Sequence, residues 1–143
     1  MIRFEAEDAR LLPAERLRLR RWLQALAAAY GHRCRAVTYI FLSDDELLEV
    51  NRQYLAHDYY TDIITFDNRE EPGQGPIEAD IFISVERVAD NAATYGTAPA
   101  AELRRVLAHG LLHLLGLADK TDAQAAQMRQ AEDQALALWD ATA

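Results

Sequence analysis

The spacing of apolar residues divides the chain into short strands and longer helices. Alternating or continuous apolar residues, rich in β-branched and aromatic types, predict four strands over residues 2–6, 36–42, 62–66 and 79–84. Apolar residues three and four positions apart predict five helices, over residues 14–30, 43–54, 84–95, 99–116 and from 121 to at least 139. The predicted order of elements is therefore β-α-β-α-β-β-α-α-α.

Residues at the predicted helix ends support these boundaries. Ser43 and Glu46 have the spacing of a capping box, in which two side chains satisfy free backbone N–H groups at the start of a helix. Thr121 and Gln124 repeat this spacing before the last helix. Gly31 stands where the first helix should end, because glycine adopts the left-handed conformation that often terminates helices.

The segment VLAHGLLHLLGL, residues 106–117, is apolar on all sides except for its two histidines. A helix of this kind is normally buried, so we expect it to be the central helix of the fold. The fold class predicted is α+β, a small mixed sheet of about four strands covered by helices around this central helix. A length of 143 residues predicts a single domain over residues 1–143.

Composition predicts a cytoplasmic protein without a membrane segment. No apolar run reaches the roughly 18 residues that a membrane span requires, and the N-terminal segment lacks the apolar region of a signal peptide. Cys34 is the only cysteine, which excludes an internal disulfide and a cysteine-rich zinc site.

The charge of the chain leaves its partner open. A formal net charge of −8 is unusual for a protein that binds nucleic acid. However, residues 1–35 carry eight arginines against four acidic residues, and arginine makes two-pronged contacts with phosphate. These arginines suit RNA, but a GC-rich genome and a solvated helix face explain them more simply.

Two histidines on the central helix form the strongest candidate for chemistry. His109 and His113 are four residues apart and therefore share one face of the helix. Gly116 then permits a tight turn, after which Asp119 can supply a carboxylate oxygen. We predict that His109, His113 and Asp119 bind one zinc ion, with the fourth position open for catalysis. The alternative is a pair of core histidines with hydrogen-bond partners and an Asp119 that caps the last helix.

Gly110 distinguishes this pattern from the zinc-protease motif H-E-x-x-H. That motif has a glutamate, the general base, directly after the first histidine. Here Gly110 occupies this position, so peptide hydrolysis by the usual route is disfavoured. A glycine also permits the close approach of neighbouring backbone.

Four motifs resemble one known family. The segments VNRQYLAHDYYTDIITF, EADIFIS, HGLLHLLGLAD and MRQAED occur in the order and spacing found in the YbeY proteins, bacterial zinc endoribonucleases of ribosomal RNA maturation. The resemblance implies a zinc-dependent endoribonuclease specific for single-stranded RNA. It also implies action on 16S rRNA 3′ ends, in ribosome quality control and with the small ribosomal subunit as partner.

The chain departs from the family pattern at two positions. Most members have a third histidine where this chain has Asp119, and the DKT sequence there resembles a Bacteroidetes-like variant. Carboxylate is a competent zinc ligand, so the site remains complete. Leu55 replaces an arginine implicated in RNA handling, and Arg52 and His57 are the polar residues nearby that could substitute for it.

Roles beyond the metal ligands stay open at this stage. Asp62 and Asp80 resemble family positions and could accept hydrogen bonds from the ligand histidines, although both could equally be turn or strand-end carboxylates. The residues do not identify a general base. Two other functions fit the motif: a ribosome-assembly factor with structural zinc, and a zinc hydrolase of peptides or small molecules. Nickel and cobalt would also accept these ligands.

Overall fold

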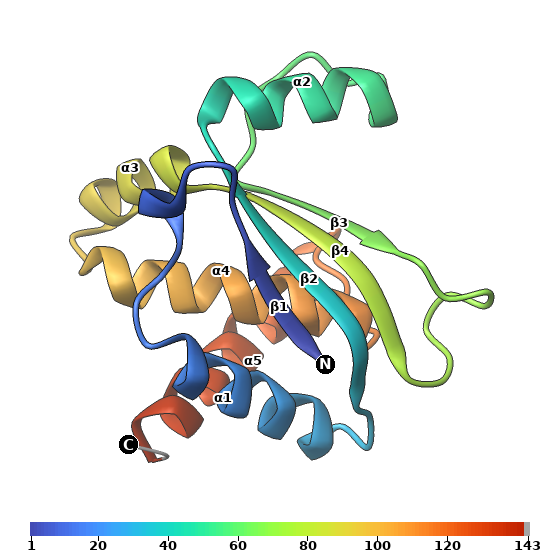
Figure 1. The fold of residues 1–143 in the computed structure, drawn as a ribbon. Helices are drawn as coiled ribbons and strands as arrows, with labels where there is room; N and C mark the ends of the chain where they lie inside the picture. Colours follow the sequence, from blue (N-terminus) through green and yellow to red (C-terminus); the bar gives the residue numbers. More distant parts are fainter. Residues whose placement is uncertain (142–143) are drawn as a thin grey trace.

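Four strands form one mixed sheet in the order β1-β2-β4-β3 (Figure 1). The structure, a computed structural model, describes residues 1–141; the predicted domain over residues 1–143 extends two residues outside this range. The strands are β1 (Ile2–Glu5), β2 (Cys34–Leu42), β3 (Ile63–Asp67) and β4 (Ile77–Ser84). Strands β1, β2 and β4 are parallel, whereas β3 runs antiparallel to β4 and forms one edge of the sheet.

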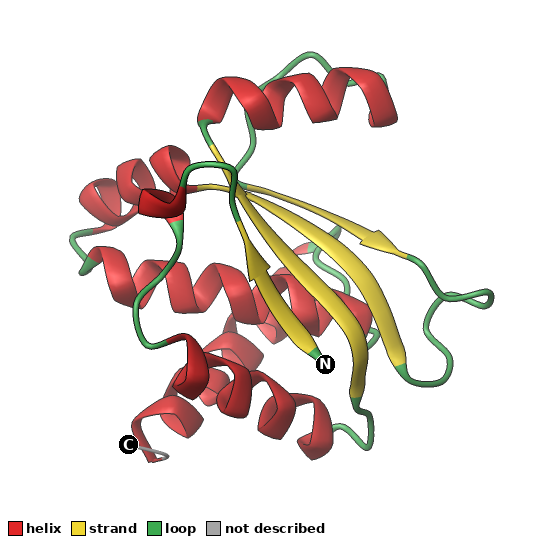
Figure 2. Cartoon of the chain, in the orientation of Figure 1, coloured by secondary structure: helices red, strands yellow, loops and turns green. Residues whose placement is uncertain are grey.

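Five α-helices and one short 3-10 helix complete the described residues (Figure 2). They are α1 (Arg16–Ala29), α2 (Asp44–Leu55), α3 (Val85–Tyr95), α4 (Pro99–Leu114), α5 (Asp122–Ala141) and the 3-10 helix Ala9–Leu11. The predicted order of strands and α-helices is confirmed, and only the 3-10 helix was not expected. None of the helices in the described residues is long and apolar enough to cross a membrane.

The residues predicted to mark the helix ends form the expected structures. The Ser43 hydroxyl accepts from the backbone N–H of Glu46 at 3.2 Å, and the Glu46 carboxylate accepts from the N–H of Ser43 at 3.0 Å. Thr121 and Gln124 form the same reciprocal pair before α5. Gly31 follows α1 with a φ of +77°, a conformation that glycine adopts at low cost. The capping predictions are therefore confirmed.

Two strands begin earlier than predicted. Strands β2 and β4 start at Cys34 and Ile77, each two residues before its expected start. These two residues pair with each other across an irregular step in the β2–β4 register. In β4 the apolar alternation continues through the added residues, with Ile77, Ala79 and Ile81 all buried, so the predicted start was placed too late.

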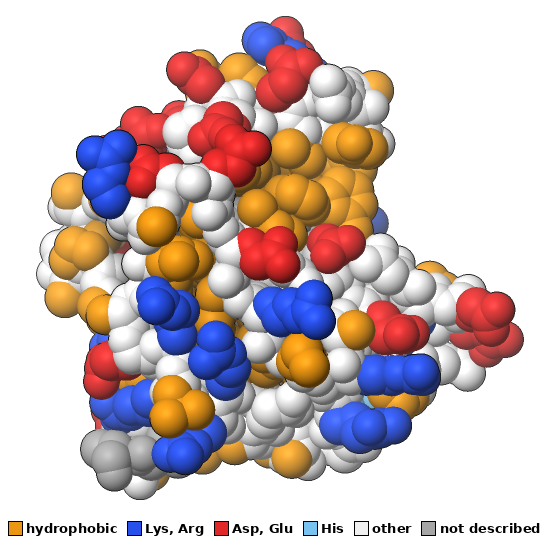
Figure 3. All heavy atoms as spheres, viewed as in Figure 1, with side chains coloured by type: hydrophobic (Ala, Val, Ile, Leu, Met, Phe, Trp, Pro, Cys, Tyr) orange, Lys and Arg blue, Asp and Glu red, His pale blue; other side chains and the backbone are white. Residues whose placement is uncertain are grey.

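Helix α4 is the buried centre of the fold, as predicted. It packs with α1 on one face of the sheet, while α2 lies over the opposite face (Figure 1). Leu107, Leu111 and Leu112 of α4 are fully buried. The Tyr39 hydroxyl of β2 donates a 3.1 Å hydrogen bond to the Leu107 carbonyl, which ties the sheet to the helix. The opposite face is less fully covered, and Figure 3 shows apolar side chains at the surface beneath α2.

Gly110 allows α4 to lie close to the sheet. A β-carbon built on Gly110 would come within 2.9 Å of the Ile63 side chain on β3 and 3.3 Å of the Ile81 side chain on β4. Both distances are shorter than ordinary van der Waals contact. The predicted close approach is confirmed, with strand side chains as the neighbours in place of backbone. It brings the histidine-bearing face of α4 next to the edge strand.

Candidate metal centre

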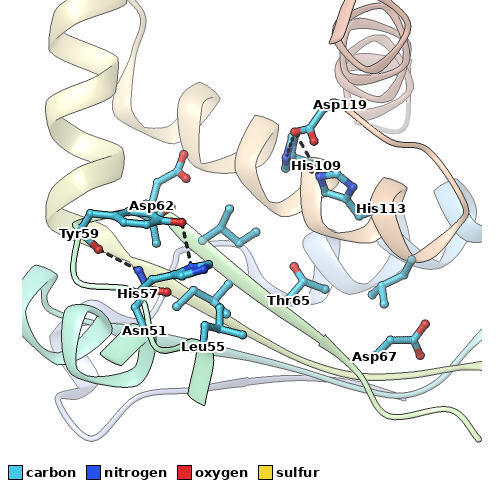
Figure 4. Close-up of a pocket in the computed structure, with 14 residues that line it drawn as sticks. Asn51, Leu55, His57, Tyr59, Asp62, Thr65, Asp67, His109, His113 and Asp119 are labelled. Carbon is cyan, nitrogen blue, oxygen red and sulfur yellow. Dashed lines mark hydrogen bonds and ion pairs between the residues drawn. The ribbon is translucent and has the colours of Figure 1, made fainter. Parts of the chain in front are cut away.

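Three predicted ligands converge at the C-terminal end of α4 (Figure 4). The Nε2 atoms of His109 and His113 are 3.0 Å apart, because residues four apart project from the same face of the helix. Gly116, with a φ of +106°, turns the chain after the helix. Asp119 then returns so that one carboxylate oxygen, Oδ2, lies 3.4 Å from Nε2 of each histidine.

The second nitrogen of each histidine has its own acceptor. Nδ1 of His109 lies 2.7 Å from Oε2 of Glu132 on α5. Nδ1 of His113 lies 2.9 Å from the carbonyl oxygen of Leu117. Carboxylate and carbonyl oxygens only accept hydrogen bonds, so Nδ1 of each ring carries a proton and donates it. This arrangement leaves the Nε2 atoms as the groups that face each other.

The three ligand atoms fit a metal ion. Two unprotonated Nε2 atoms at 3.0 Å repel each other unless a cation, either a proton or a metal ion, lies between them. A tetrahedral zinc ion with bonds of about 2.0–2.1 Å separates its ligand atoms by about 3.3–3.4 Å. The distances of 3.4 Å from Asp119 to both histidines match that separation. In the described residues this is the one group of three such side chains close enough to share an ion.

Glu132, which is buried, and His109, which is half-buried, form a hydrogen-bonded pair. Burial by itself would lower the pKa of His109, but the hydrogen bond and the negative charge of Glu132 outweigh it, and the net shift is upward. The pKa of Glu132 shifts downward, because the hydrogen bonds from His109 and Arg105 outweigh the effect of its burial. Arg105 donates to Glu132 at 2.9 Å and to Asp133 at 2.6 Å. The charge of Glu132 is thus compensated on both sides.

The three candidate ligands lie between two cavities. The first, of about 550 Å³, extends toward α2 and the segment that follows it. The second, of about 670 Å³, extends toward α3 and α5. Asp62, Ile63, His109 and Asp119 line both cavities. A long substrate could therefore pass across the three ligands from one cavity to the other.

The two predicted aspartates do not contact the histidines. Asp80 accepts a 2.9 Å hydrogen bond from Asn68 instead. Asp62 lines both cavities, burial raises the pKa of its carboxyl, and its side-chain partner is Asn91 at 3.4 Å. Of the two alternatives for Asp62 and Asp80, the one in which they accept hydrogen bonds from the ligand histidines is wrong, because Glu132 and the Leu117 carbonyl occupy both Nδ1 positions.

Leu55, which stands where the family has an arginine, and the two polar residues near it do not all face the same cavity. Leu55 and His57 line the first cavity. Arg52 forms an ion pair with Asp58 and does not line it. His57 is stacked on Tyr59, which also lines the cavity and which the sequence did not single out. Only one of the two suggested substitutes therefore faces the metal centre.

Comparisons with known proteins agree with this structure. A family model described as Endoribonuclease YbeY matches residues 3–140. Endoribonuclease YbeY of Cytophaga hutchinsonii is 49% identical over 135 residues, which cover 94% of this chain and 93% of that protein. The protein of the same name from Parabacteroides distasonis is 44% identical over 137 residues, which cover 96% of this chain and 94% of that protein.

A solved structure extends the agreement to the fold. The solution structure of TM1509 from Thermotoga maritima superposes with a TM-score of 0.66 at 26% identity, covering 99% of this chain and 93% of that one. The resemblance carried by the four sequence motifs is confirmed by the family model and by the curated relatives. This chain belongs to the endoribonuclease YbeY family.

Proposed function

We propose that this chain is a zinc-dependent endoribonuclease that hydrolyses single-stranded RNA, with His109, His113 and Asp119 as the metal ligands. Membership of the family makes it a hydrolase of RNA phosphodiester bonds. The observation that carries the metal site is the convergence of three ligand atoms beside two cavities. A structural zinc site is normally closed by four protein ligands, whereas a catalytic site keeps one position open. The open cavities therefore favour catalysis over a purely structural ion.

A zinc ion at these ligands supplies a Lewis acid that polarises a phosphate oxygen and makes water more acidic. The chain's own residues prepare the ligands for this ion. Glu132 and the Leu117 carbonyl hold the protons on the Nδ1 atoms, so that the Nε2 lone pairs of His109 and His113 remain available. This preparation fixes the orientation of both rings before substrate arrives.

Asp62 is our candidate for proton transfer during hydrolysis. Its carboxylate lines both cavities beside His109. Burial raises the pKa of this carboxyl, which moves it toward the range in which a carboxylate accepts a proton efficiently at neutral pH. Arg105 and Arg129 line the second cavity and supply positive charge for the phosphates of the strand.

The cellular role follows from the resemblance to the family. We propose 16S rRNA precursors as the substrate, cleaved near their 3′ end, and the small ribosomal subunit as the partner. We further propose that the chain functions in the cytoplasm as a single domain over residues 1–143. The family's named activity and the four shared motifs support this role.

Cleavage of end-labelled RNA by the purified protein tests the proposal. Zinc-loaded protein should cut a single-stranded oligonucleotide and spare the matching duplex, and a chelator should abolish cutting until zinc is restored. His113→Ala should lose activity while keeping its fold. His32→Ala is the matched control, because His32 lies outside the metal centre beside Gly75. A folded, zinc-loaded protein that cuts no single-stranded RNA would instead favour an assembly factor.

A further inference from the structure

We propose that the first cavity binds an unpaired nucleobase, which stacks on the ring pair formed by His57 and Tyr59. This inference rests on the proposed function and names the part of the RNA that the same site recognises. Both rings line the cavity that also contains His109, His113 and Asp119. Figure 4 shows the ring pair and the three ligands on opposite sides of that cavity.

The ring pair offers a flat apolar surface beside the metal centre. The ring centroids of His57 and Tyr59 lie 5.1 Å apart, with an angle of 22° between the ring planes. The Tyr59 hydroxyl and Nδ1 of His57 are 2.9 Å apart, at hydrogen-bond distance, which fixes one ring on the other. Tyr59 is nevertheless 56% exposed, so much of its ring stays open to a ligand. Every nucleobase has a π-face that stacks on a surface of this kind.

The chain holds the ring pair in place without a ligand. Asn51 of α2 is only 1% exposed, and its side-chain amide donates a 2.9 Å hydrogen bond to the Tyr59 carbonyl. The backbone carbonyl of Asn51 accepts a 3.2 Å hydrogen bond from the N–H of His57. The ion pair between Arg52 and Asp58 ties the same segment to α2 a second time. A surface fixed in advance loses less conformational freedom when it binds a ligand.

The arginines of the second cavity favour it for the phosphates and leave the first cavity to the base. Among the described residues, no lysine or arginine lines the first cavity, whereas Asp62, Asp67 and Asp119 do. A phosphate there would meet Asp62 and Asp119. The guanidinium of Arg69 is buried in its ion pair with Asp67 and does not line the cavity. The second cavity, across His109 and Asp119, also has acidic residues in its lining, but it contains two arginines. Arg105 is ion-paired with Glu132 and Asp133, whereas Arg129 is exposed. The strand would therefore cross the metal centre with a base on the ring pair and its phosphates toward these arginines.

This arrangement gives a physical reason for selecting single strands. A base in a duplex is stacked and paired, so its π-face is unavailable unless the base is first flipped out of the helix. A base in a single strand is already free to enter the cavity. Selection for unpaired RNA would thus come from the ring pair and not from a basic groove.

Binding of two short probes to the zinc-loaded protein tests the proposal. Both are fluorescein-labelled hexamers with 2′-O-methyl riboses, which resist cleavage; one is all adenine, and the other has no bases. The wild type should bind the adenine probe roughly tenfold more tightly, the lower part of the range for stacking one base on an aromatic side chain. Tyr59→Ala should lose this preference, and Tyr59→Phe should keep most of it. Tyr30→Ala is the control, because Tyr30 is also exposed but does not line this cavity.

The two probes make the outcomes distinct. Equal binding of both probes by the wild type would overturn the proposal, even if Tyr59→Ala failed to fold. An equal loss of affinity for both probes in folded Tyr59→Ala would also overturn it, since the preference for the adenine probe would then persist without the Tyr59 ring. A wild type that cuts no RNA but prefers the adenine probe through Tyr59 would refute the nuclease and support the stacking site.

Discussion

Replacement of Glu132 by glutamine isolates the role of its charge in preparing the metal centre. Glu132 is 8% exposed, and its two carboxylate oxygens contact Nδ1 of His109 at 2.7 Å and Arg105 at 2.9 Å. The glutamine oxygen of Glu132→Gln can still accept from one of these groups, but the negative charge that strengthens the histidine as a ligand is lost. Groups that orient a metal ligand in this way typically contribute about 10–100-fold in metal affinity.

We expect Glu132→Gln to weaken zinc binding by about tenfold or more, which corresponds to about 1.4 kcal/mol or more of binding free energy. Competition with a chromophoric chelator at fixed pH measures the zinc dissociation constant directly. Folding in urea should be less affected, because Arg105 keeps its 2.6 Å contact with Asp133.

Asp133→Asn is the matched control for this experiment. Asp133 is the neighbouring carboxylate, also bound by Arg105, but its side chain is 60% exposed and Arg105 is its one ion-pair partner among residues 1–141. Its replacement should change the zinc dissociation constant by no more than about twofold, since exposed ion pairs contribute little. Equal zinc affinities for Glu132→Gln and Asp133→Asn would refute the role that we assign to Glu132.

Three further predictions concern the fold. Arg69→Met should destabilise the protein by about 3 kcal/mol in urea, because Arg69 is buried against Asp67 and the Leu114 carbonyl. The hydrogen bonds from Arg69 lower the pKa of Asp67, so the stabilisation by this ion pair is present above about pH 4 and should fall as acid protonates Asp67. A loss of unfolding free energy in Arg69→Met that stays the same below about pH 4 would contradict this. Burial raises the pKa of Cys34 to about 11, so at pH 8 a disulfide reagent should modify the native thiol at least about 100-fold more slowly than the urea-unfolded one. Ser43→Ala removes a capping-box bond and should cost about 1 kcal/mol of unfolding free energy, with Glu46→Ala similar.

The sequence was sufficient where the relevant contacts are local. Helix periodicity and capping boxes predicted the element order, because each signal acts within a few residues. The spacing of His109, His113 and Asp119, with a glycine turn between, likewise places the three ligand groups within reach of one another. The metal itself stays a prediction, since proximity of ligands is a condition for binding and not its measurement.

Contacts between distant segments could not be derived in this way. Glu132 and His109 are 23 residues apart in the sequence, and the packing of α5 on α4 brings their side chains together. The motif MRQAED contains this glutamate, but nothing local connects it to a histidine. Asp62 and Asp80 were one alternative for that role because their sequence positions resemble the family's, and neither side chain contacts a ligand histidine.

The ring pair beside the metal centre was missed for a related reason. His57 and Tyr59 follow Ala56, which ends α2 in the left-handed conformation with a φ of 54°. Glycine is the usual residue in this conformation, and alanine seldom adopts it. Because position 56 is an alanine, the sequence gives no signal of the turn. The buried Asn51 compensates by binding the backbone of the segment that follows, and this contact too is visible only in three dimensions.

The zinc content of the wild type and of Asp119→Ala, measured by mass spectrometry on protein purified without chelator or metal-affinity tag, tests the central claim most directly. We predict close to one zinc ion per wild-type chain and clearly less in Asp119→Ala, with both proteins folded. Zinc fully retained by Asp119→Ala would mean that another residue completes the site. A folded wild type that contains no zinc and cannot be loaded with it would contradict the metal-dependent mechanism outright.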